Sequence, residues 1–108
     1  MPEPEVGWLD LGPLDAFAQG GTRVEVGADR LAVFRLGEDL YVIGDRCSHA
    51  EASLAEGEVF DLEVECFKHG SSFDLRTGRP CTLPATVPVP VYETRVEDGR
   101  LAVREVKA

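Results

Sequence analysis

Two short stretches decide how this sequence folds: DRCSHA at residues 45–50 and CFKHGS at residues 66–71. Each places a cysteine just before one of the only two histidines in the chain, with the spacings C-x-H and C-x-x-H, and sixteen residues separate the two pairs. The four candidate ligands are Cys47, His49, Cys66 and His69. Because thiolates and imidazoles bind metals, this set predicts either a tetrahedral metal site or a binuclear cluster.

Zinc and an iron–sulfur cluster are the two alternatives for such a ligand set. Structural zinc sites usually begin with two closely spaced cysteines and end with paired histidines or cysteines, whereas each arm here contributes one of each. Mixed arms suit a binuclear centre in which thiolates hold one iron and imidazoles hold the other. A zinc-stabilised interaction module stays open as an alternative, and the colour of the purified protein separates the two, since zinc leaves it colourless.

The sequence around both pairs resembles the Rieske 2Fe–2S motif. The likeness continues through three longer stretches, CSHAEASLAEGEV, ECFKHGSSFDLRTGRP and CTLPATVPVPVY. Together they are similar to the soluble Rieske ferredoxins of bacterial ring-hydroxylating dioxygenase systems, from about Gly27 to the end of the chain. The resemblance implies an all-β, Rieske-like fold of small antiparallel sheets, with a cluster-binding subdomain formed by two loops.

The resemblance also implies one Rieske-type 2Fe–2S cluster. One iron would bind the two cysteines, Cys47 and Cys66. The other would bind the two histidines, His49 and His69, which lie at the exposed tip of such proteins. The hydroxyl of Ser71 would lie near a cluster sulfur, and the segment around Pro84 would cover the cluster from the side.

Two departures from the respiratory members of this family indicate the subtype. Those proteins carry an extra disulfide-forming cysteine in each arm, where this chain has Ala52 and Lys68. They also carry a tyrosine two residues after the motif serine, where this chain has Phe73. Because the phenol would donate a hydrogen bond that stabilises the reduced cluster, its loss predicts a reduction potential at the low end of the Rieske range, about −150 mV.

The expected function is one-electron transfer. Two thiolates bring the oxidised core to neutrality whereas four leave it a dianion, so exchanging two thiolates for neutral imidazoles raises the reduction potential. The resemblance implies a carrier, not itself an enzyme, that passes electrons from an NAD(P)H-dependent flavin reductase to a terminal oxygenase. A stand-alone Rieske ferredoxin of another pathway, such as iron–sulfur assembly or a nitrite-reductase-like small subunit, is the alternative.

Length and composition favour a single domain over residues 1–108. The apolar fraction of 44 % is ordinary for a globular protein, and no uninterrupted apolar run approaches the length of a membrane span. The first ten residues, MPEPEVGWLD, lack the basic start and apolar core of a signal peptide. We therefore expect a cytoplasmic protein with no membrane partner.

Charge favours protein partners over nucleic acid. The net charge is −9, and residues 51–65 hold six acidic residues and no basic one. Nucleic-acid binding depends on basic patches that neutralise phosphates, so the net charge argues against nucleic acid as a partner. The acidic stretch predicts transient electrostatic docking to a basic patch on a partner; the alternative is a merely solvated loop.

The third cysteine, Cys81, has no histidine or cysteine close to it in the sequence. Three cysteines in a reducing compartment indicate metal binding or free thiols, not a disulfide framework. We interpret Cys81 as a small buried hydrophobic residue.

Period-two alternation predicts the strands. Strands are expected around residues 22–27, at 31–36 and at 40–43, with a hairpin turn between the last two. Leu62, Val64 and Cys66 share one parity, which predicts that Cys66 ends a strand. The prolines at residues 84–90 predict an extended loop, and the alternation from Tyr92 to Val103 predicts a hairpin that turns at Asp98–Gly99. The segment from Ser48 has a composition that favours a helix, which conflicts with metal binding by the same loop.

Overall fold

The computed structural model describes residues 8–26, 29–47, 52–66, 71–81 and 87–106. The described residues form nine strands and two short 3₁₀ turns, with no α-helix among them. The strands are β1 (Leu9–Pro13), β2 (Gly20–Val26), β3 (Asp29–Leu36), β4 (Asp39–Gly44), β5 (Glu58–Phe60), β6 (Glu63–Glu65), β7 (Ser72–Asp74), β8 (Val91–Glu97) and β9 (Arg100–Glu105). The 3₁₀ turns are η1 (Leu14–Ala16) and η2 (Leu54–Glu56).

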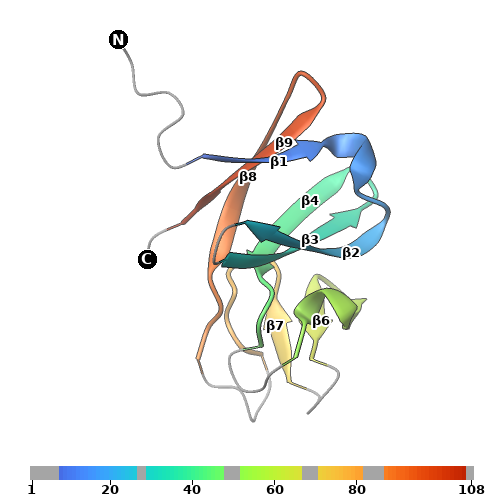
Figure 1. The fold of residues 1–108 in the computed structure, drawn as a ribbon. Helices are drawn as coiled ribbons and strands as arrows, with labels where there is room; N and C mark the ends of the chain where they lie inside the picture. Colours follow the sequence, from blue (N-terminus) through green and yellow to red (C-terminus); the bar gives the residue numbers. More distant parts are fainter. Residues whose placement is uncertain (1–7, 27–28, 48–51, 67–70, 82–86, 107–108) are drawn as a thin grey trace.

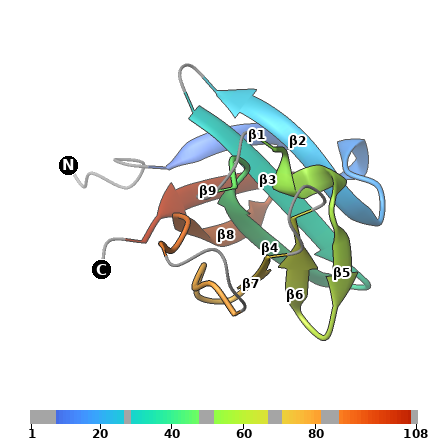
Figure 2. The same cartoon turned by 90° about the horizontal axis from the view of Figure 1, so that it is seen from below.

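Within these ranges the strands form two antiparallel sheets. The larger has six strands in the order β1-β9-β8-β4-β3-β2, and the smaller has the order β5-β6-β7 (Figure 1). The small sheet lies below β3 and β4 in the view of Figure 1, and the turned view of Figure 2 also places it next to β4. The expected all-β fold of small antiparallel sheets is therefore confirmed.

The β2–β3–β4 meander follows the predicted alternation. The register pairs Val24 with Leu31 and Leu36 with Asp39, so β3 and β4 form the predicted hairpin, with a turn of two residues. Gly37 occupies that turn with φ of 66°, a left-handed conformation that glycine adopts without steric cost.

Strands β3 and β4 separate two hydrophobic cores. Ala32 and Phe34 face one core, whereas Leu31 and Val33 face the other, because successive side chains of a strand point to opposite faces. The first core contains Ala32, Phe34, Ile43, Cys47, Ala52, Leu54, Val64, Cys66, Phe73, Leu75 and Val89. We call it the lower core. The apolar character of both parities in β3, evident in the sequence, thus reflects burial on both faces.

The C-terminal hairpin is also as predicted. Strands β8 and β9 pair from Tyr92↔Glu105 to Glu97↔Arg100. The turn residues Asp98 and Gly99 have φ of 54° and 73°, the positive values of a tight two-residue hairpin turn.

Strand β1 was not predicted from the sequence. It pairs with β9 through Leu9↔Val103 and Asp10↔Ala102. Trp8, just before it, stacks against two guanidinium groups, with Arg95 Cζ at 4.4 Å and Arg104 Cζ at 4.6 Å from the ring centroid. These contacts attach the N-terminal strand to the C-terminal hairpin.

The small sheet differs from the expected strand in one detail. Leu62 does not belong to β6; it lies with Asp61 in a turn where both have positive φ, 63° and 50°. The turn therefore moves the start of β6 to Glu63, but Val64 and Cys66 are buried as the alternation predicts.

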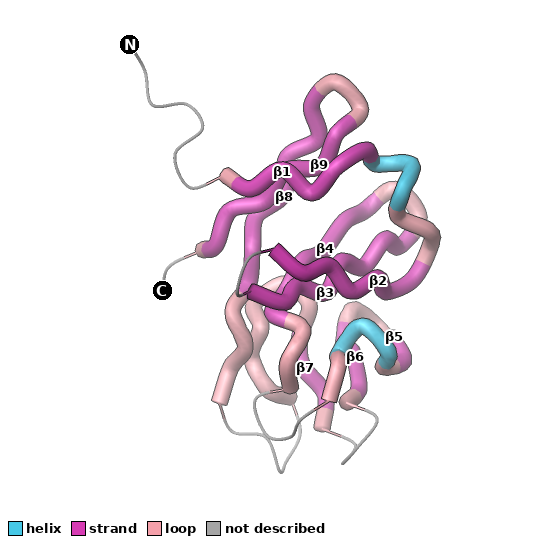
Figure 3. The backbone as a smooth tube through the Cα atoms, in the orientation of Figure 1, coloured by secondary structure: helices cyan, strands magenta, loops and turns pink. Residues whose placement is uncertain are grey.

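The described residues that follow β4 and β7 lie at one end of the molecule, next to the small sheet (Figure 3). Residues 87–90, the described part of the expected proline-bearing loop, carry no regular secondary structure. The helix-favouring segment from Ser48 to Glu51 lies outside the described residues, and its described continuation ends in the single 3₁₀ turn η2. None of the helical segments within the described ranges has the length and apolarity required to span a bilayer.

Candidate metal centre

The first candidate arm is the end of a hairpin that leaves β4 and returns to η2. Arg46 pairs with Ser53 in an antiparallel bridge. One residue further, the N–H of Cys47 donates to the carbonyl oxygen of Ala52 at 3.0 Å. Cys47 is therefore held at the end of this hairpin ladder.

The second arm repeats this plan between β6 and β7. Glu65 pairs with Ser72, and the N–H of Cys66 donates to the carbonyl oxygen of Ser71 at 2.6 Å. In each arm the amide of a cysteine is bonded to the carbonyl five residues later, at the point where an antiparallel ladder ends. Two loops of equal length thus present their cysteines in the same way.

Both cysteines are buried in the lower core. Cys47 is 3 % exposed and Cys66 is 0 % exposed. No disulfide joins the three cysteines of the chain, all of which lie in the described ranges. Two cysteines that come from matching hairpins to one apolar core fit a site in which both bind one metal ion.

The two histidines and the covering segment lie outside the described residues. His49 belongs to residues 48–51, His69 to residues 67–70, and Pro84 to residues 82–86. Within the part of the chain that the structure describes, no group of three or more His, Cys, Asp and Glu residues gathers as a metal site. The ligand assignment of His49 and His69 therefore stays a prediction.

Ser71 and the subtype positions Ala52 and Phe73 are buried beside the cysteines, whereas the third subtype position, Lys68, lies outside the described residues. Ser71 and Phe73 are 0 % exposed, and Ala52 is 5 % exposed. Phe73 and Ala52 belong to the lower core together with both cysteines. The position of Ser71 is fixed by its backbone bond to Cys66, whereas the role of its hydroxyl toward a cluster sulfur stays a prediction.

The sequence analysis did not single out Asp45, which is fully buried two residues before Cys47. Its carboxylate oxygen Oδ1 accepts a hydrogen bond from the hydroxyl of Ser53 at 2.7 Å and another from the N–H of Ala55 at 2.9 Å. Oδ2 lies 3.3 Å from Nε of Arg30. The sequence carries no local signal for this burial, because an aspartate after an apolar strand is ordinarily exposed.

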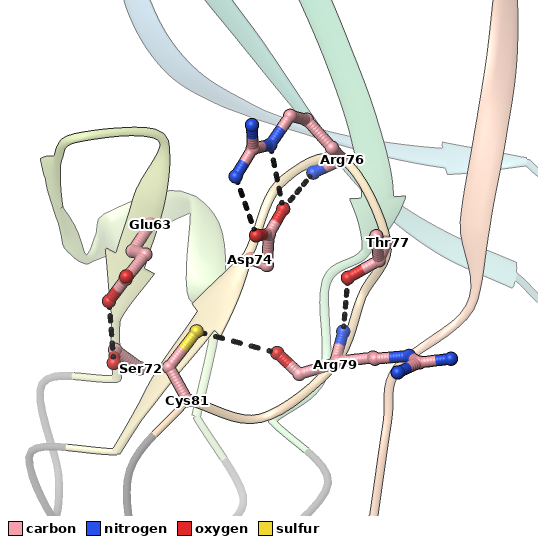
Figure 4. Close-up of polar contacts among 7 residues, drawn as sticks. All are labelled: Glu63, Ser72, Asp74, Arg76, Thr77, Arg79 and Cys81. Carbon is pink, nitrogen blue, oxygen red and sulfur yellow. Dashed lines mark hydrogen bonds and ion pairs between the residues drawn. The ribbon is translucent and has the colours of Figure 1, made fainter.

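The expectation for Cys81 is wrong, because Cys81 is exposed. Its N–H donates to the carbonyl oxygen of Ser72 at 2.7 Å, and its Sγ lies 3.8 Å from the carbonyl oxygen of Arg79 (Figure 4). The adjacent bridge pairs Phe73 with Pro80. Since Phe73 faces the core, Ser72 and Cys81 face away from it.

The pKa of the Cys81 thiol is raised, first by desolvation and then by the nearby carboxylates of Glu63 and Asp74. Figure 4 shows Glu63 beside Ser72, whose hydroxyl donates to Oε1 of Glu63 at 3.1 Å. A raised pKa keeps the thiol protonated and lowers its reactivity. Cys81 is therefore a less reactive thiol than its exposure alone suggests.

The turn after β7 is closed by an aspartate–arginine pair. Both carboxylate oxygens of Asp74 accept from the guanidinium of Arg76, at 3.2 and 3.0 Å, and Oδ1 also accepts from the Arg76 N–H at 2.7 Å (Figure 4). Hydrogen bonding to the Arg76 side chain is the main cause of the lowered pKa of Asp74. The turn, and with it the end of β7, is fixed on the side away from Ser71.

Comparison with known proteins agrees with this geometry. A family model described as the Rieske [2Fe-2S] domain matches residues 7–93. The ferredoxin subunit of anthranilate 1,2-dioxygenase from Burkholderia cepacia is 42 % identical over 97 residues, covering 89 % of this chain and 90 % of that protein.

Two solved structures are similar to this chain in both fold and sequence. The ferredoxin of carbazole 1,9a-dioxygenase from Nocardioides aromaticivorans IC177 has a TM-score of 0.83 at 37 % identity, covering 90 % of this chain and 96 % of that one. A chain in a complex of reduced oxygenase and oxidized ferredoxin in carbazole 1,9a-dioxygenase has a TM-score of 0.82 at 38 % identity, covering 94 % and 96 %. The chain thus belongs to the Rieske [2Fe-2S] domain family, with a Rieske 2Fe–2S cluster as its cofactor.

Proposed function

We propose that this chain is a one-electron carrier that passes electrons from an NAD(P)H-dependent flavin reductase to the terminal oxygenase of a ring-hydroxylating dioxygenase system. The observation that carries the proposal is the pair of matching hairpin arms, which bring Cys47 and Cys66 into one buried core within a chain that matches the ferredoxin subunits of such systems. The likeness to a ferredoxin in complex with its oxygenase supports an oxygenase as the acceptor.

We assign one iron to Cys47 and Cys66 and the other to His49 and His69, as the resemblance implies. Burial of both cysteines supports the first half of this assignment, because it places the two thiolates away from water. When bound, the cluster supplies a one-electron couple. The chain's own contribution is to hold the ligands on two rigid hairpin ends and to keep water from the thiolates.

The acidic hairpin is the proposed docking element. It consists of η2, β5 and β6, and its exposed acidic residues are Glu56, Glu58, Asp61 and Glu65. Phe60 lies among them on β5 with 58 % of its surface exposed. An apolar side chain surrounded by carboxylates matches a partner surface that is basic with an apolar centre, since charges steer the encounter and apolar contact retains it.

We also propose that residues 1–108 form a single Rieske domain. Strand β9 pairs with β1 as well as β8, which ties the two ends of the described chain into one sheet. We place the carrier in the cytoplasm, where the reductase would find NAD(P)H and where thiols stay reduced.

The test is direct. The purified protein should be red-brown, contain iron and no zinc, and give a reduced-state electron-spin signal with a low average g set by histidine-bound ferrous iron. A flavin reductase that reduces another Rieske ferredoxin should reduce it with NAD(P)H as the electron source. A colourless zinc protein, or an iron protein that no such reductase reduces, would overturn the proposal.

A further inference from the structure

The anchor of the first arm is a buried charge. Asp45 follows β4 directly, is 0 % exposed, and lies two residues before Cys47. Its backbone carbonyl accepts from the N–H of Leu54 at 2.7 Å, while its side chain accepts from the Ser53 hydroxyl and the Ala55 N–H. One residue thus binds three consecutive residues, Ser53 and the first two residues of η2.

The compensating charge comes from the neighbouring strand. Arg30, on β3, places Nε 3.3 Å from Oδ2 of Asp45, and its carbonyl accepts from the N–H of Asp45 at 2.9 Å. Neither Nε of Arg30 nor Oδ2 of Asp45 has a hydrogen bond of acceptable geometry within the described residues. The attraction between the two charges, and not a directed hydrogen bond, therefore compensates this carboxylate oxygen.

Stability alone does not explain an ion pair in this place. Apolar side chains of similar volume often stabilise a buried position as well as an ion pair does, whereas removing one partner leaves an uncompensated charge. The Arg30 side chain is 29 % exposed and the Asp45 side chain 0 %, so the carboxylate is the partner that depends on the pair. We therefore look for a role of the two charges other than stabilising the fold.

Both charges lie close to the first arm. Asp45 is two residues before Cys47 in the chain, and Arg30 on β3 lies beside Asp45. Charges in the interior are only weakly screened by salt, so each acts on a neighbouring redox centre. The negative charge favours the oxidised state and the positive charge favours the reduced state.

We propose that the Arg30–Asp45 ion pair positions the first cluster arm and that its two charges set the reduction potential in opposite directions. The inference rests on the proposed function, because it places the cluster at Cys47. Asp45 acts here as a positioning residue, through the backbone of the arm and through its charge, without touching the cluster.

The test compares substitutions of each partner at one fixed pH. Asp45→Asn keeps the shape of the side chain and removes its charge, which leaves Arg30 uncompensated and should raise the potential. Arg30→Met removes the opposite charge and should lower it. We expect each change to alter the redox equilibrium at least threefold, about 28 mV for a one-electron couple at 59 mV per tenfold change. Arg30→Lys retains the charge and should restore a potential close to that of the wild type.

The controls are Asp10→Asn and Arg100→Met, which remove the partners of an exposed ion pair between β1 and β9. They make the same changes of charge away from the arms. The redox equilibrium should stay within 1.5-fold of that of the wild type, which corresponds to a potential within about 10 mV. Urea unfolding measured alongside should show both buried-pair variants less stable than the controls, because each leaves a charge without its partner.

Opposite shifts for Asp45→Asn and Arg30→Met support the inference. Shifts in the same direction, or potentials that match those of the controls, overturn it even if both variants are destabilised. If Arg30→Met retains no cluster, Asp45→Asn and Arg30→Lys decide alone. The first must shift the redox equilibrium at least threefold toward the reduced state, about 28 mV, and the second must not. Failure of the proposed function is a separate outcome, visible as a wild-type protein without a Rieske signal.

Discussion

The N–H of Cys66 donates to the carbonyl oxygen of Ser71 at 2.6 Å, so the second arm is closed by the same residue whose hydroxyl is predicted to lie near a cluster sulfur. The closing bond uses the backbone of Ser71 and not its side chain. Substitution of the hydroxyl therefore leaves the loop closed. This separation makes Ser71 suitable for measuring the effect of a single hydrogen bond on the potential.

Ser71→Ala should lower the reduction potential by some tens of millivolts. A hydroxyl that donates to a cluster sulfur binds the reduced, more negative state more strongly. A hydrogen bond to a charged group contributes about 1.5–3 kcal/mol, and only the part of this energy that differs between the two redox states shifts the potential. Tenfold in equilibrium is about 1.4 kcal/mol, or 59 mV for one electron. Protein-film voltammetry measures the shift. Ser72→Ala is the matched control, since the Ser72 hydroxyl bonds to Glu63; an equal shift in both variants would contradict the assignment.

Two of the three cysteines, Cys47 and Cys66, should bind iron, and Cys81 should not. Cys47→Ser and Cys66→Ser should each abolish cluster binding, because each removes a thiolate from the buried pair. Cys81→Ser should retain the full iron content and absorbance, since Cys81 is exposed on the far side of β7 from Phe73. Iron analysis of the three purified variants gives the answer. Loss of the cluster in Cys81→Ser would contradict the two-cysteine assignment.

Replacement of either histidine by cysteine tests the other half of the ligand set. His49→Cys and His69→Cys should either lose the cluster or lower its potential, because an added thiolate makes the site more negative. Electron-spin resonance of the reduced variants checks the outcome. A wild-type signal like that of an all-cysteine ferredoxin would show that the histidines are not ligands.

Charge reversal on the acidic hairpin should slow electron transfer. Glu56→Lys combined with Glu58→Lys removes two exposed carboxylates near the arms and should lower the rate of reduction by the reductase about tenfold at low salt, with the difference vanishing at high salt. Stopped-flow reduction at two ionic strengths measures it. Glu97→Lys with Glu105→Lys, both exposed on the β8–β9 hairpin, makes the same change of charge elsewhere. Equal effects of the two double variants would indicate a general charge effect and no docking site.

Cys81 should react slowly with iodoacetamide for an exposed thiol. Because its pKa is raised above the ordinary value of 9.0, less thiolate is present at pH 8, and the labelling rate should rise only at higher pH. Glu63→Gln removes one contributing charge and should speed labelling, although desolvation, the largest cause, remains. Mass spectrometry over a pH series follows the reaction. Glu93→Gln on β8 serves as the control, and equal rates in the two variants would show that Glu63 does not act on Cys81.

The sequence predicted those parts of the fold that depend on local patterns. The turns at Gly37 and at Asp98–Gly99 are set by residues adjacent in the chain, and the Cys/His spacings follow from the loops themselves. Strand β1 was missed because LDLGP is short and contains glycine and proline, and only its pairing with β9, some ninety residues away, makes it a strand. A pairing partner that distant leaves no periodic signal.

The missed and mistaken residues of the site have the same origin. Asp45 is buried because Arg30, Ser53 and Ala55 meet it in space, and no two of these form a recognisable motif in sequence. Cys81 was expected inside because cysteines usually are buried, but the bridge between Phe73 and Pro80 directs it outward. The direction of a side chain near an irregular turn depends on which residues pair across the strands, and this pairing cannot be predicted from composition.

The contact between Gly57 and Glu65 has an evolutionary consequence. Gly57 follows η2 on the return from the first arm, and Glu65 precedes Cys66; a Cβ added to Gly57 would lie 2.0 Å from the carbonyl oxygen of Glu65. The main chain of Gly57 thus packs directly against the main chain of Glu65, with a methyl group of Val64 beside it. Over generations, the close approach of these two segments therefore depends on keeping the glycine, since any side chain at position 57 would push Gly57 and Glu65 apart in a single mutational step.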